Sequence, residues 1–362
     1  MSRLVTPDEL AERVVRDMQR NLLRARHGIA YLTGGSEPPL GTSPKSTVWR
    51  RDKARLYRFN SDVRRYAPPV LIVHSLVSRS YILDLTPQMS FAGSLRDAGF
   101  DVYLLDWGEP DSTDAANTLE KYIDGYVRES VESILEVSGS SDVTLLGYCF
   151  GGVLATMFTL RHPRFVRNLI TMAMPVDFTE LGVLSGVFKQ GRLEPDFIID
   201  ETGNVPAAMM HTSFKLLRPT GSTVQYANLW QNLWNDEYVE GHKAMTRWTS
   251  AHIPFAGAAF RQVIDLFMRD NALMAGTVEL GDTSTALADL VCPVLNVFAE
   301  RDHVVPPEAA EPLAGLVGSS DVEELRIPGG HASLVTGRQA ARVTLPGIIR
   351  WLDNHSEEVI SA

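Results

Sequence analysis

The stretch DVTLLGYCFGG, residues 142–152, decides the fold. Its mostly apolar segment VTLL at 143–146 predicts a buried strand, and VLATMFTLRHP after residue 152 predicts a helix. A sharp turn from strand to helix needs small residues two positions before and two positions after its central residue, because side chains there would collide with the backbone. Gly147 and Gly151 hold those positions around Cys149. The pattern is typical of a nucleophile elbow, G-x-S-x-G, with a thiol in place of the hydroxyl.

Strands and helices alternate on both sides of this turn. The alternating stretch STVWRRDKARLYRF (46–59) predicts a pair of strands. Further strands are predicted in PPVLIVHSLV (68–77), DVYLLDWG (101–108), NLITMAMPV (168–176), CPVLNVFAERD (292–302) and VEELRIP (322–328). Helices are predicted around SFAGSLRDAGF (90–100), TLEKYIDGYVRESVESILEVSG (118–139) and LPGIIRWLDNH (345–355). This alternation predicts an α/β fold with a mostly parallel, doubly wound sheet that is covered by helices on both faces.

The alternation stops for about a hundred residues, and we expect this insertion to be a helical cap over the carboxyl edge of the sheet. It is helix-rich and holds Trp230, Trp234 and Trp248. The predicted domains are an N-terminal helix and linker (1–45), a core (46–176 and 291–362) and the cap (177–290).

The N-terminal segment has a helical signature of its own. Thr6 is the expected helix cap and Pro7 the first helical residue. Apolar residues recur there at helical spacing, at Leu10, Val14, Met18 and Leu22.

Composition excludes several classes of protein. The 362 residues carry a formal net charge of −10, which argues against a nucleic-acid binder. Two cysteines are too few for a disulfide framework or a cysteine-ligated metal, and Cys292 is expected to be a core residue. No apolar run is long enough for a membrane span, and the first residues do not form a secretory signal. We therefore expect a cytoplasmic protein with reduced thiols and without a metal or cofactor.

Three side chains at strand ends are candidates for catalysis. Cys149 begins a helix, where free backbone amides and the helix dipole favour a thiolate. In this fold the acid and then the histidine follow the nucleophile along the chain. The acid is expected after a late strand, which selects Asp302 after VLNVFA. The histidine is expected after the next strand, which selects His331, after VEELRIP, from the nine histidines. In such a triad the histidine acts as the base and the acid orients it. The alternatives are an ordinary buried cysteine for Cys149 and a structural loop histidine for His331.

Other residues are candidates for binding. The backbone amides of Phe150 and Val77 are expected to form an oxyanion hole. Arg79, His303 and Trp248 are candidates for contact with the substrate, although a surface salt bridge explains Arg79 equally well.

With these residues in place, the chain resembles the catalytic C subunit of class III polyhydroxyalkanoate synthases, which have an α/β-hydrolase fold. The likeness runs from about Ser46 to the final helix. It rests on VWRRDKARLYRF, LVSRSYILDL, DVYLLDWGEPD, GYCFGG, MPVDF, DETGNVPAAMMHTSF, CPVLNVFAERDHVVPP and IPGGHASLVTG. The chain departs from the family pattern at Phe150, where Gln is more usual, at Ser78 in place of Asn, and at Ala332-Ser333 in place of Ile-Gly. These departures bear on substrate size and on the class.

The resemblance implies an acyltransferase that polymerises (R)-3-hydroxyacyl-CoA, typically 3-hydroxybutyryl-CoA, into polyester with release of CoA. It implies that Cys149 carries the growing chain as a thioester and that His331 activates the thiol. Asp302 would orient His331 or help to deprotonate the incoming 3-hydroxyl. The implied partners are the substrate and polyester chain, the E subunit of class III enzymes, a second copy in a homodimer, and the surface of cytoplasmic polymer granules rather than a membrane.

Two other functions fit the same residues. A thioesterase or an intracellular polyester depolymerase would use the same triad and differ only in the acceptor, which is water. A granule-coating scaffold with an unreactive cysteine is the non-enzymatic alternative.

Overall fold

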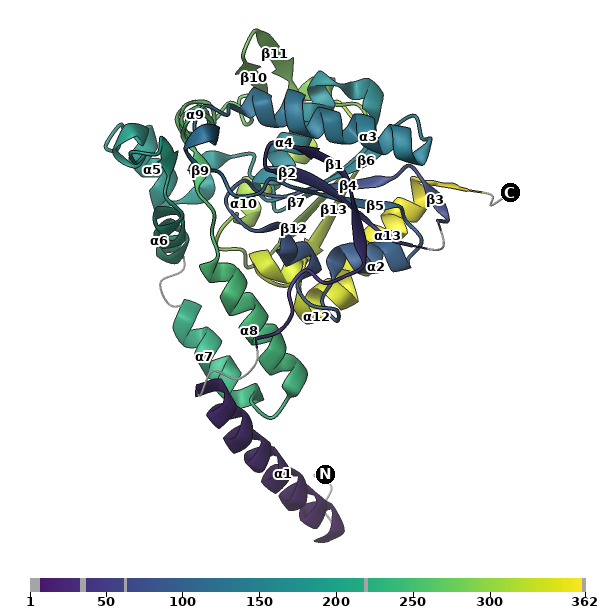
Figure 1. Cartoon of the computed structure of the whole chain (residues 1–362), viewed down its shortest axis with the longest axis vertical. Helices are drawn as coiled ribbons and strands as arrows, with labels where there is room; N and C mark the ends of the chain where they lie inside the picture. Colours follow the sequence, from purple (N-terminus) through teal and green to yellow (C-terminus); the bar gives the residue numbers. More distant parts are fainter. Residues whose placement is uncertain (1–6, 33–36, 62–63, 218–220, 360–362) are drawn as a thin grey trace.

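The computed structural model describes residues 7–32, 37–61, 64–217 and 221–359. At the centre of the described chain lies an eight-stranded sheet of order β1-β2-β5-β4-β6-β7-β12-β13 (Figure 1). Its strands are β1 (Lys45–Arg51), β2 (Ala54–Phe59), β4 (Val70–Val73), β5 (Val102–Asp106), β6 (Val143–Tyr148), β7 (Val166–Met172), β12 (Val294–Ala299) and β13 (Val322–Ile327). β1, β2 and β5 pair antiparallel, and all pairs from β5 to β13 are parallel. The predicted mostly parallel α/β sheet is confirmed.

Helices cover both faces of this sheet. The helices of the core are α2 (Phe91–Asp97), α3 (Arg128–Ser138), α4 (Phe150–Arg161), α10 (Pro307–Ala310), α11 (Leu313–Leu316), α12 (Gly337–Gln339) and α13 (Leu345–Asn354). α2 and α13 pack together on one face, and α3 and α4 lie on the other. No helix among the described residues is long and apolar enough to cross a bilayer.

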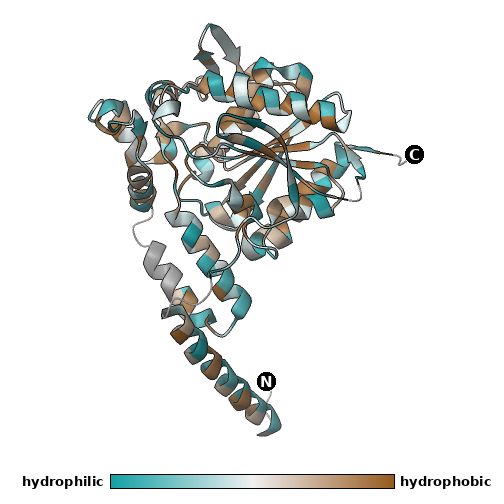
Figure 2. Cartoon of the chain, viewed as in Figure 1, coloured by the Kyte–Doolittle hydropathy of each residue, from teal (hydrophilic) through white to brown (hydrophobic). Residues whose placement is uncertain are grey.

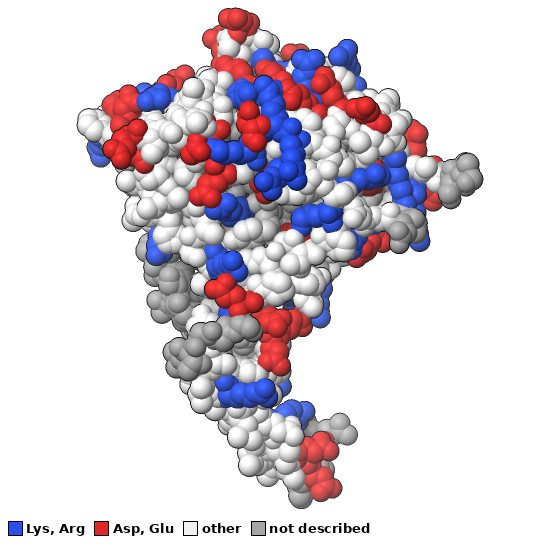
Figure 3. All heavy atoms as spheres, in the orientation of Figure 1, with Lys and Arg blue, Asp and Glu red and all other residues white. Residues whose placement is uncertain are grey.

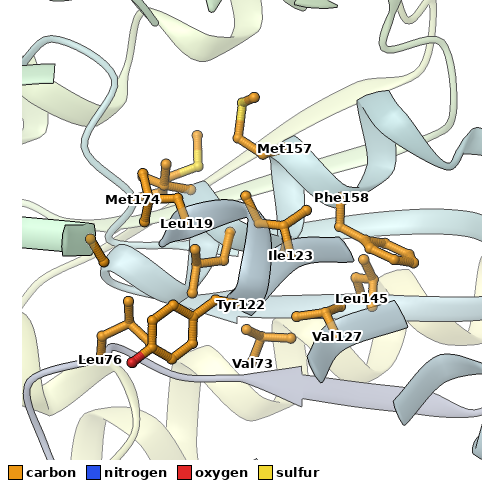
Figure 4. Packing of buried hydrophobic residues seen from close by; sticks show 14 of the residues in the cluster. Val73, Leu76, Leu119, Tyr122, Ile123, Val127, Leu145, Met157, Phe158 and Met174 are labelled. Carbon is orange, nitrogen blue, oxygen red and sulfur yellow. The ribbon is translucent and has the colours of Figure 1, made fainter. Parts of the chain in front are cut away.

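The core is divided by the sheet into two clusters, because successive side chains of a strand point to opposite faces. In β4, Leu71 and Val73 join the cluster under α3 and α4, and Val70 and Ile72 join the cluster under α2 and α13. All four residues are fully buried, and the central strands are mostly hydrophobic (Figure 2). Figure 4 shows the first cluster, in which Val73 and Leu145 of the sheet lie close to Ile123, Val127 and Phe158 of the covering helices.

The helix predicted over residues 118–139 is present but irregular. It begins with a π-helical turn, η3 (Lys121–Val127), and continues as α3. Asp124 in this turn accepts hydrogen bonds from Arg161 and His162 at the end of α4, the Arg161 Nη2–Oδ2 distance being 2.7 Å. The π turn is therefore tied to the helix that follows Cys149.

The insertion between β7 and β12 is mainly helical. It contains α5 (Val183–Lys189), α6 (Ala207–Leu217), α7 (Gly221–Asn232), α8 (Asp236–Ser250), α9 (Gly257–Gln262) and the π-helical η7 (Val263–Arg269). It also contains two short antiparallel pairs that the sequence analysis did not predict, β8 (Asn204–Val205) with β9 (Phe255–Ala256) and β10 (Thr277–Leu280) with β11 (Thr283–Ala286). The division of the chain into domains at residues 45, 176 and 290 stays a prediction.

The N-terminal helix α1 (Pro7–Leu32) begins at the predicted proline, whereas Thr6 lies outside the described residues. After it, residues 37–44 run along the core and are fastened by one buried carboxylate. Asp84 accepts hydrogen bonds from Ser43 Oγ at 2.5 Å, Ser90 Oγ at 2.7 Å and Lys45 Nζ at 2.7 Å. Asp84 is 1% exposed. Lys45 is thus the counter-ion of a charge that water does not reach.

We expect Lys45→Ala to lower the free energy of unfolding by about 3 kcal/mol, because the buried Asp84 carboxylate loses its counter-ion. Arg128→Ala is the control, since Arg128 and Glu132 form a half-exposed ion pair worth about 0.5 kcal/mol or less. Urea denaturation followed by circular dichroism measures both variants. Equal losses of stability in the two variants would contradict this account of Asp84.

Candidate active site

The turn between β6 and α4 holds Cys149 in a strained conformation. Its backbone has φ 57° and ψ −129°, in the left-handed half of φ that side chains rarely adopt. The turn is close enough to β4 that a Cβ on Gly151 would lie 2.1 Å from the Val73 carbonyl oxygen. A Cβ on Gly147 would lie 2.4 Å from the Gly152 Cα. The glycines of the motif are therefore required by backbone contacts within the turn and to the neighbouring strand.

His331 and Asp302 meet beside this turn, at the ends of β13 and β12. His331 Nδ1 donates to Asp302 Oδ2 at 2.7 Å. The other carboxylate oxygen, Oδ1, accepts from the amides of Val304 at 2.8 Å and Val305 at 3.0 Å. The Asp302 side chain is fully buried. Both of its oxygens are engaged, so the carboxylate is fixed behind the imidazole.

The third member of the predicted triad is in contact with the same imidazole. Burial disfavours the charged form of His331, but the charges of Asp302 and Cys149, and hydrogen bonds with both, raise the pKa of this histidine well above its ordinary value. A histidine with a raised pKa stays protonated at neutral pH, so its ring can donate a hydrogen bond to a neighbouring sulfur. The structure thus brings the three residues together as an acid, an imidazolium and a thiol.

Tyr148 supports the imidazole, and the sequence analysis did not single it out. Its ring lies 5.2 Å from the His331 ring, and its hydroxyl donates to the His331 carbonyl oxygen at 3.2 Å. The residue before Cys149 points to the face of the sheet opposite α4, into the cluster with α2 and α13. Its position inside GYCFGG was the available signal, but a local motif does not show which distant loop a side chain meets.

One predicted oxyanion donor, Phe150, lies in the turn itself, and the other, Val77, lies in the loop after β4. α4 begins at Phe150, so its amide is among the helix N-terminal amides that have no partner within the helix. Val77 is buried in the loop after β4, where its carbonyl oxygen accepts from the Ile253 amide at 3.4 Å. Their joint action on one oxyanion stays a prediction.

His74 lies in the same loop and does not compete with His331 as a base. Burial lowers the pKa of His74 to about 4, so its imidazole is neutral at physiological pH. Neither ring nitrogen has a hydrogen-bond partner among the described residues. Its carbonyl oxygen accepts from Trp107 Nε1 at 3.0 Å, which fixes the loop to the end of β5.

Arg79, Trp248 and His303, the three candidates for substrate contact, do not form one cluster of side chains. Trp248 at the end of α8 donates from Nε1 to the Arg79 carbonyl oxygen at 2.9 Å. The Arg79 guanidinium forms a salt bridge with Glu109 at 2.7 Å, which is the alternative to substrate contact given in the sequence analysis. His303 is exposed. Trp248 and Cys149 both pack against the core cluster that α2 and α13 cover.

Within the described residues, no three His, Cys, Asp or Glu side chains are grouped as metal ligands. Cys292, the other thiol, is partly buried ahead of β12, and burial raises its pKa to about 11. The two cysteines therefore differ in the charge around them, since His331 lies beside only Cys149.

We expect iodoacetamide at pH 7 to alkylate Cys149 and to leave Cys292 unmodified, because a thiol of pKa 11 is ionised in only about one molecule in ten thousand at that pH. Peptide mass spectrometry measures both sites in one sample. His331→Gln removes the imidazolium and should slow alkylation of Cys149 by about tenfold or more. Equal rates at the two cysteines in the wild type would contradict a role of His331 in activating Cys149.

Comparisons with known proteins agree with this geometry. A family model described as the alpha/beta hydrolase fold matches residues 68–337. Among solved structures, a soluble variant of monoglyceride lipase from Saccharomyces cerevisiae aligns with a TM-score of 0.56, covering 89% of this chain and 100% of the lipase. Its sequence identity is 13%, so it shows the fold alone.

Relatives of higher identity carry one shared name. The chain is 38% identical over 355 residues to the poly(3-hydroxyalkanoate) polymerase subunit PhaC of Allochromatium vinosum, covering 96% of this chain and 98% of that subunit. It is 33% identical over 335 residues to the PhaC subunit of Synechocystis sp., covering 90% and 89% of the two chains. A chain that shares about a third of its residues with these subunits along nearly its whole length belongs to the PhaC family of poly(3-hydroxyalkanoate) polymerase subunits, within the alpha/beta hydrolase fold.

Proposed function

We propose that this chain polymerises (R)-3-hydroxyacyl-CoA, with 3-hydroxybutyryl-CoA as the expected substrate, and releases CoA through a thioester on Cys149. The observation that carries the proposal is the contact of Cys149 with an imidazole whose pKa is raised and whose other nitrogen is held by the buried Asp302. The names of the PhaC relatives support polymerisation rather than another acyl transfer.

In the first step, the Cys149 thiolate attacks the thioester carbonyl of the substrate. The oxyanion that forms is stabilised by the amides of Phe150 and Val77. The bond to the CoA sulfur breaks, and the His331 imidazolium gives its proton to the departing thiolate. Exchange between two thioesters is easy in this direction and in reverse, because both leaving groups are thiolates of similar basicity.

In the second step, a 3-hydroxyl oxygen attacks the Cys149 thioester, so that an ester bond forms as the carbon–sulfur bond breaks. The neutral His331 takes the hydroxyl proton. Asp302 acts by orienting His331, because its Oδ2 is hydrogen-bonded to the imidazole and its Oδ1 to two backbone amides. A fully buried carboxylate without a free oxygen does not reach a substrate hydroxyl.

Water is the competing acceptor at the second step. Contacts of α8 with the loop after β4, through Trp248 and Arg79, hold the cap against the site and favour exclusion of water. Hydrolysis of the same thioester would make the chain a thioesterase, and the experiment below separates the two functions. We further propose that the chain acts on cytoplasmic granules and pairs with the E subunit of class III synthases.

Assays of CoA release and turbidity with (R)-3-hydroxybutyryl-CoA, with and without a class III E subunit, test the proposal. We expect CoA release together with growing turbidity from insoluble polymer. Cys149→Ala should lower CoA release by at least about a thousandfold, because the covalent step is lost. The control Cys292→Ala should retain most of the activity, since Cys292 lies away from the triad.

CoA release into a clear solution of free 3-hydroxybutyrate would make the chain a thioesterase and overturn polymerisation. Substantial turnover by Cys149→Ala would overturn the mechanism. Turbidity that requires the E subunit would support the class III assignment, and equal turbidity without it would contradict that assignment.

A further inference from the structure

The side chain of Phe150 lies between the Cys149 turn and the cap. Phe150 is the first residue of α4 and directly follows Cys149. Side chains of a helix tilt towards its N-terminus, which here is the Cys149 turn. The Phe150 ring meets the ring of Phe267 in the cap helix η7 edge to face, with 6.0 Å between the ring centroids and 70° between the ring planes. A large apolar group therefore fills the space where the turn and the cap meet.

Two further aromatic rings close the cap side of Phe150. Phe267 stacks on Phe178, with 5.2 Å between the ring centroids and 19° between the ring planes. Phe267 and Phe178 are 1% and 2% exposed, whereas Phe150 is only partly buried. Protein interiors are close-packed and leave no room for an additional ring. The Phe150 ring therefore cannot withdraw into the cap.

The helix η7 is anchored to the core at both ends. At its start, Gln262 Oε1 accepts a hydrogen bond from the Leu119 amide at 2.6 Å. Just after its end, Asn271 Oδ1 accepts a hydrogen bond from the Phe178 amide at 2.9 Å. Because η7 is held at both ends, Phe267 keeps its place, and the ring that packs against it is confined as well.

In the proposed mechanism the acyl group of the substrate begins next to Phe150, because the Phe150 amide binds the oxyanion. Standard bond lengths and one hydrogen bond place the acyl carbonyl carbon within about 7 Å of the Phe150 Cβ. 3-Hydroxyacyl groups differ in the substituent on carbon 3, which is a methyl group in 3-hydroxybutyryl and a pentyl group in 3-hydroxyoctanoyl. A ring at this distance can contact the longer substituent.

Charge gives no means of telling such substrates apart. Acyl-CoA molecules that differ only in acyl length carry the same phosphates. On the face in Figure 3, basic and acidic side chains are intermixed over the body of the molecule. Discrimination between acyl lengths therefore depends on apolar side chains beside Cys149.

We propose that the Phe150 ring, backed by Phe267, is a wall that limits the length of the acyl group and selects short acyl groups over longer ones. The inference rests on the proposed function, because it names the acyl length that the same site accepts. The wall is formed by the side chain of Phe150, whereas oxyanion binding uses the backbone amide. A substitution at this position therefore changes the wall and keeps the donor.

Acylation of Cys149 by butyryl-CoA and by octanoyl-CoA, followed by mass spectrometry of the Cys149 peptide, tests the wall. In the wild type, octanoyl-CoA should react at least about 100-fold more slowly, because each methylene group that does not fit costs about tenfold or more. Phe150→Ala should shift the ratio of the two rates at least about tenfold towards octanoyl-CoA, and Phe150→Leu should give an intermediate shift. Both rates come from one sample, so any unfolded fraction cancels from the ratio.

Phe165→Ala is the matched control. Phe165 is also a partly buried phenylalanine that packs against the same core cluster, but it lies beyond the other end of α4. Its substitution should leave the ratio unchanged. Phe267→Leu tests the backing of the wall: it should shift the ratio in the same direction as Phe150→Ala but less. In the Phe150→Ala background it should add nothing, because the two rings act as a unit.

The 4-nitrophenyl esters of butyrate and octanoate separate this inference from the proposed function. The Cys149 thiolate attacks the ester carbonyl, a thioester forms as the carbon–oxygen bond breaks, and 4-nitrophenolate leaves without any need for CoA. Acylation by these esters with the expected ratios, but none by the CoA thioesters, would overturn the proposed function and support the wall.

Three results would overturn the wall while acylation of Cys149 by butyryl-CoA still supports the proposed function. They are equal rates of the wild type with both acyl lengths, a ratio that Phe150→Ala leaves unchanged because both rates fall together, and an equally large shift in Phe165→Ala.

Discussion

The close approach of two backbones governs the site. The turn after β6 lies so near the end of β4 that Gly151 has no room for a side chain against the Val73 carbonyl oxygen. This contact fixes the start of α4, and with it the strained backbone of Cys149. It also sets the loop after β4, which carries His74 and Val77, beside Cys149. The parallel pairing of β4 with β6 keeps the turn after β6 and the loop after β4 next to each other.

A buried charge provides the second constraint. Placing the Asp302 carboxylate in the interior is costly unless each oxygen has partners. Two amides and the His331 imidazole supply them, and the same interaction orients the imidazole towards Cys149. The burial of Asp302 and the orientation of His331 therefore depend on one set of hydrogen bonds. Tyr148 adds to it from the other side by contacting both the ring and the carbonyl oxygen of His331.

Much of this arrangement could be predicted from the sequence, because the relevant patterns are local. Apolar strands, the glycines around Cys149 and the order of Asp302 and His331 along the chain are all readable without tertiary contacts. The β10–β11 hairpin and the π turn at η3 were not predicted, since their residues fit a helical pattern or none. The role of Tyr148 was missed because its partner lies 183 residues away.

The tryptophans of the cap also show that contacts between distant segments cannot be predicted from sequence patterns. Composition grouped Trp230, Trp234 and Trp248 as one feature, yet the structure separates them. Trp248 contacts the loop beside the site, Trp234 receives Arg20 of α1, and Trp230 is 69% exposed. Which residues of an insertion face the site depends on how its helices are docked, and a residue count carries no such information.

We propose that Cys149 is acylated by a CoA thioester. Butyryl-CoA tests it most directly, because it offers the thioester without the 3-hydroxyl that extends the chain. Mass spectrometry of peptides after brief incubation should find one butyryl group on the Cys149 peptide, removable by hydroxylamine. A peptide that stays unmodified while CoA is released, or a butyryl group on another residue, would contradict the account.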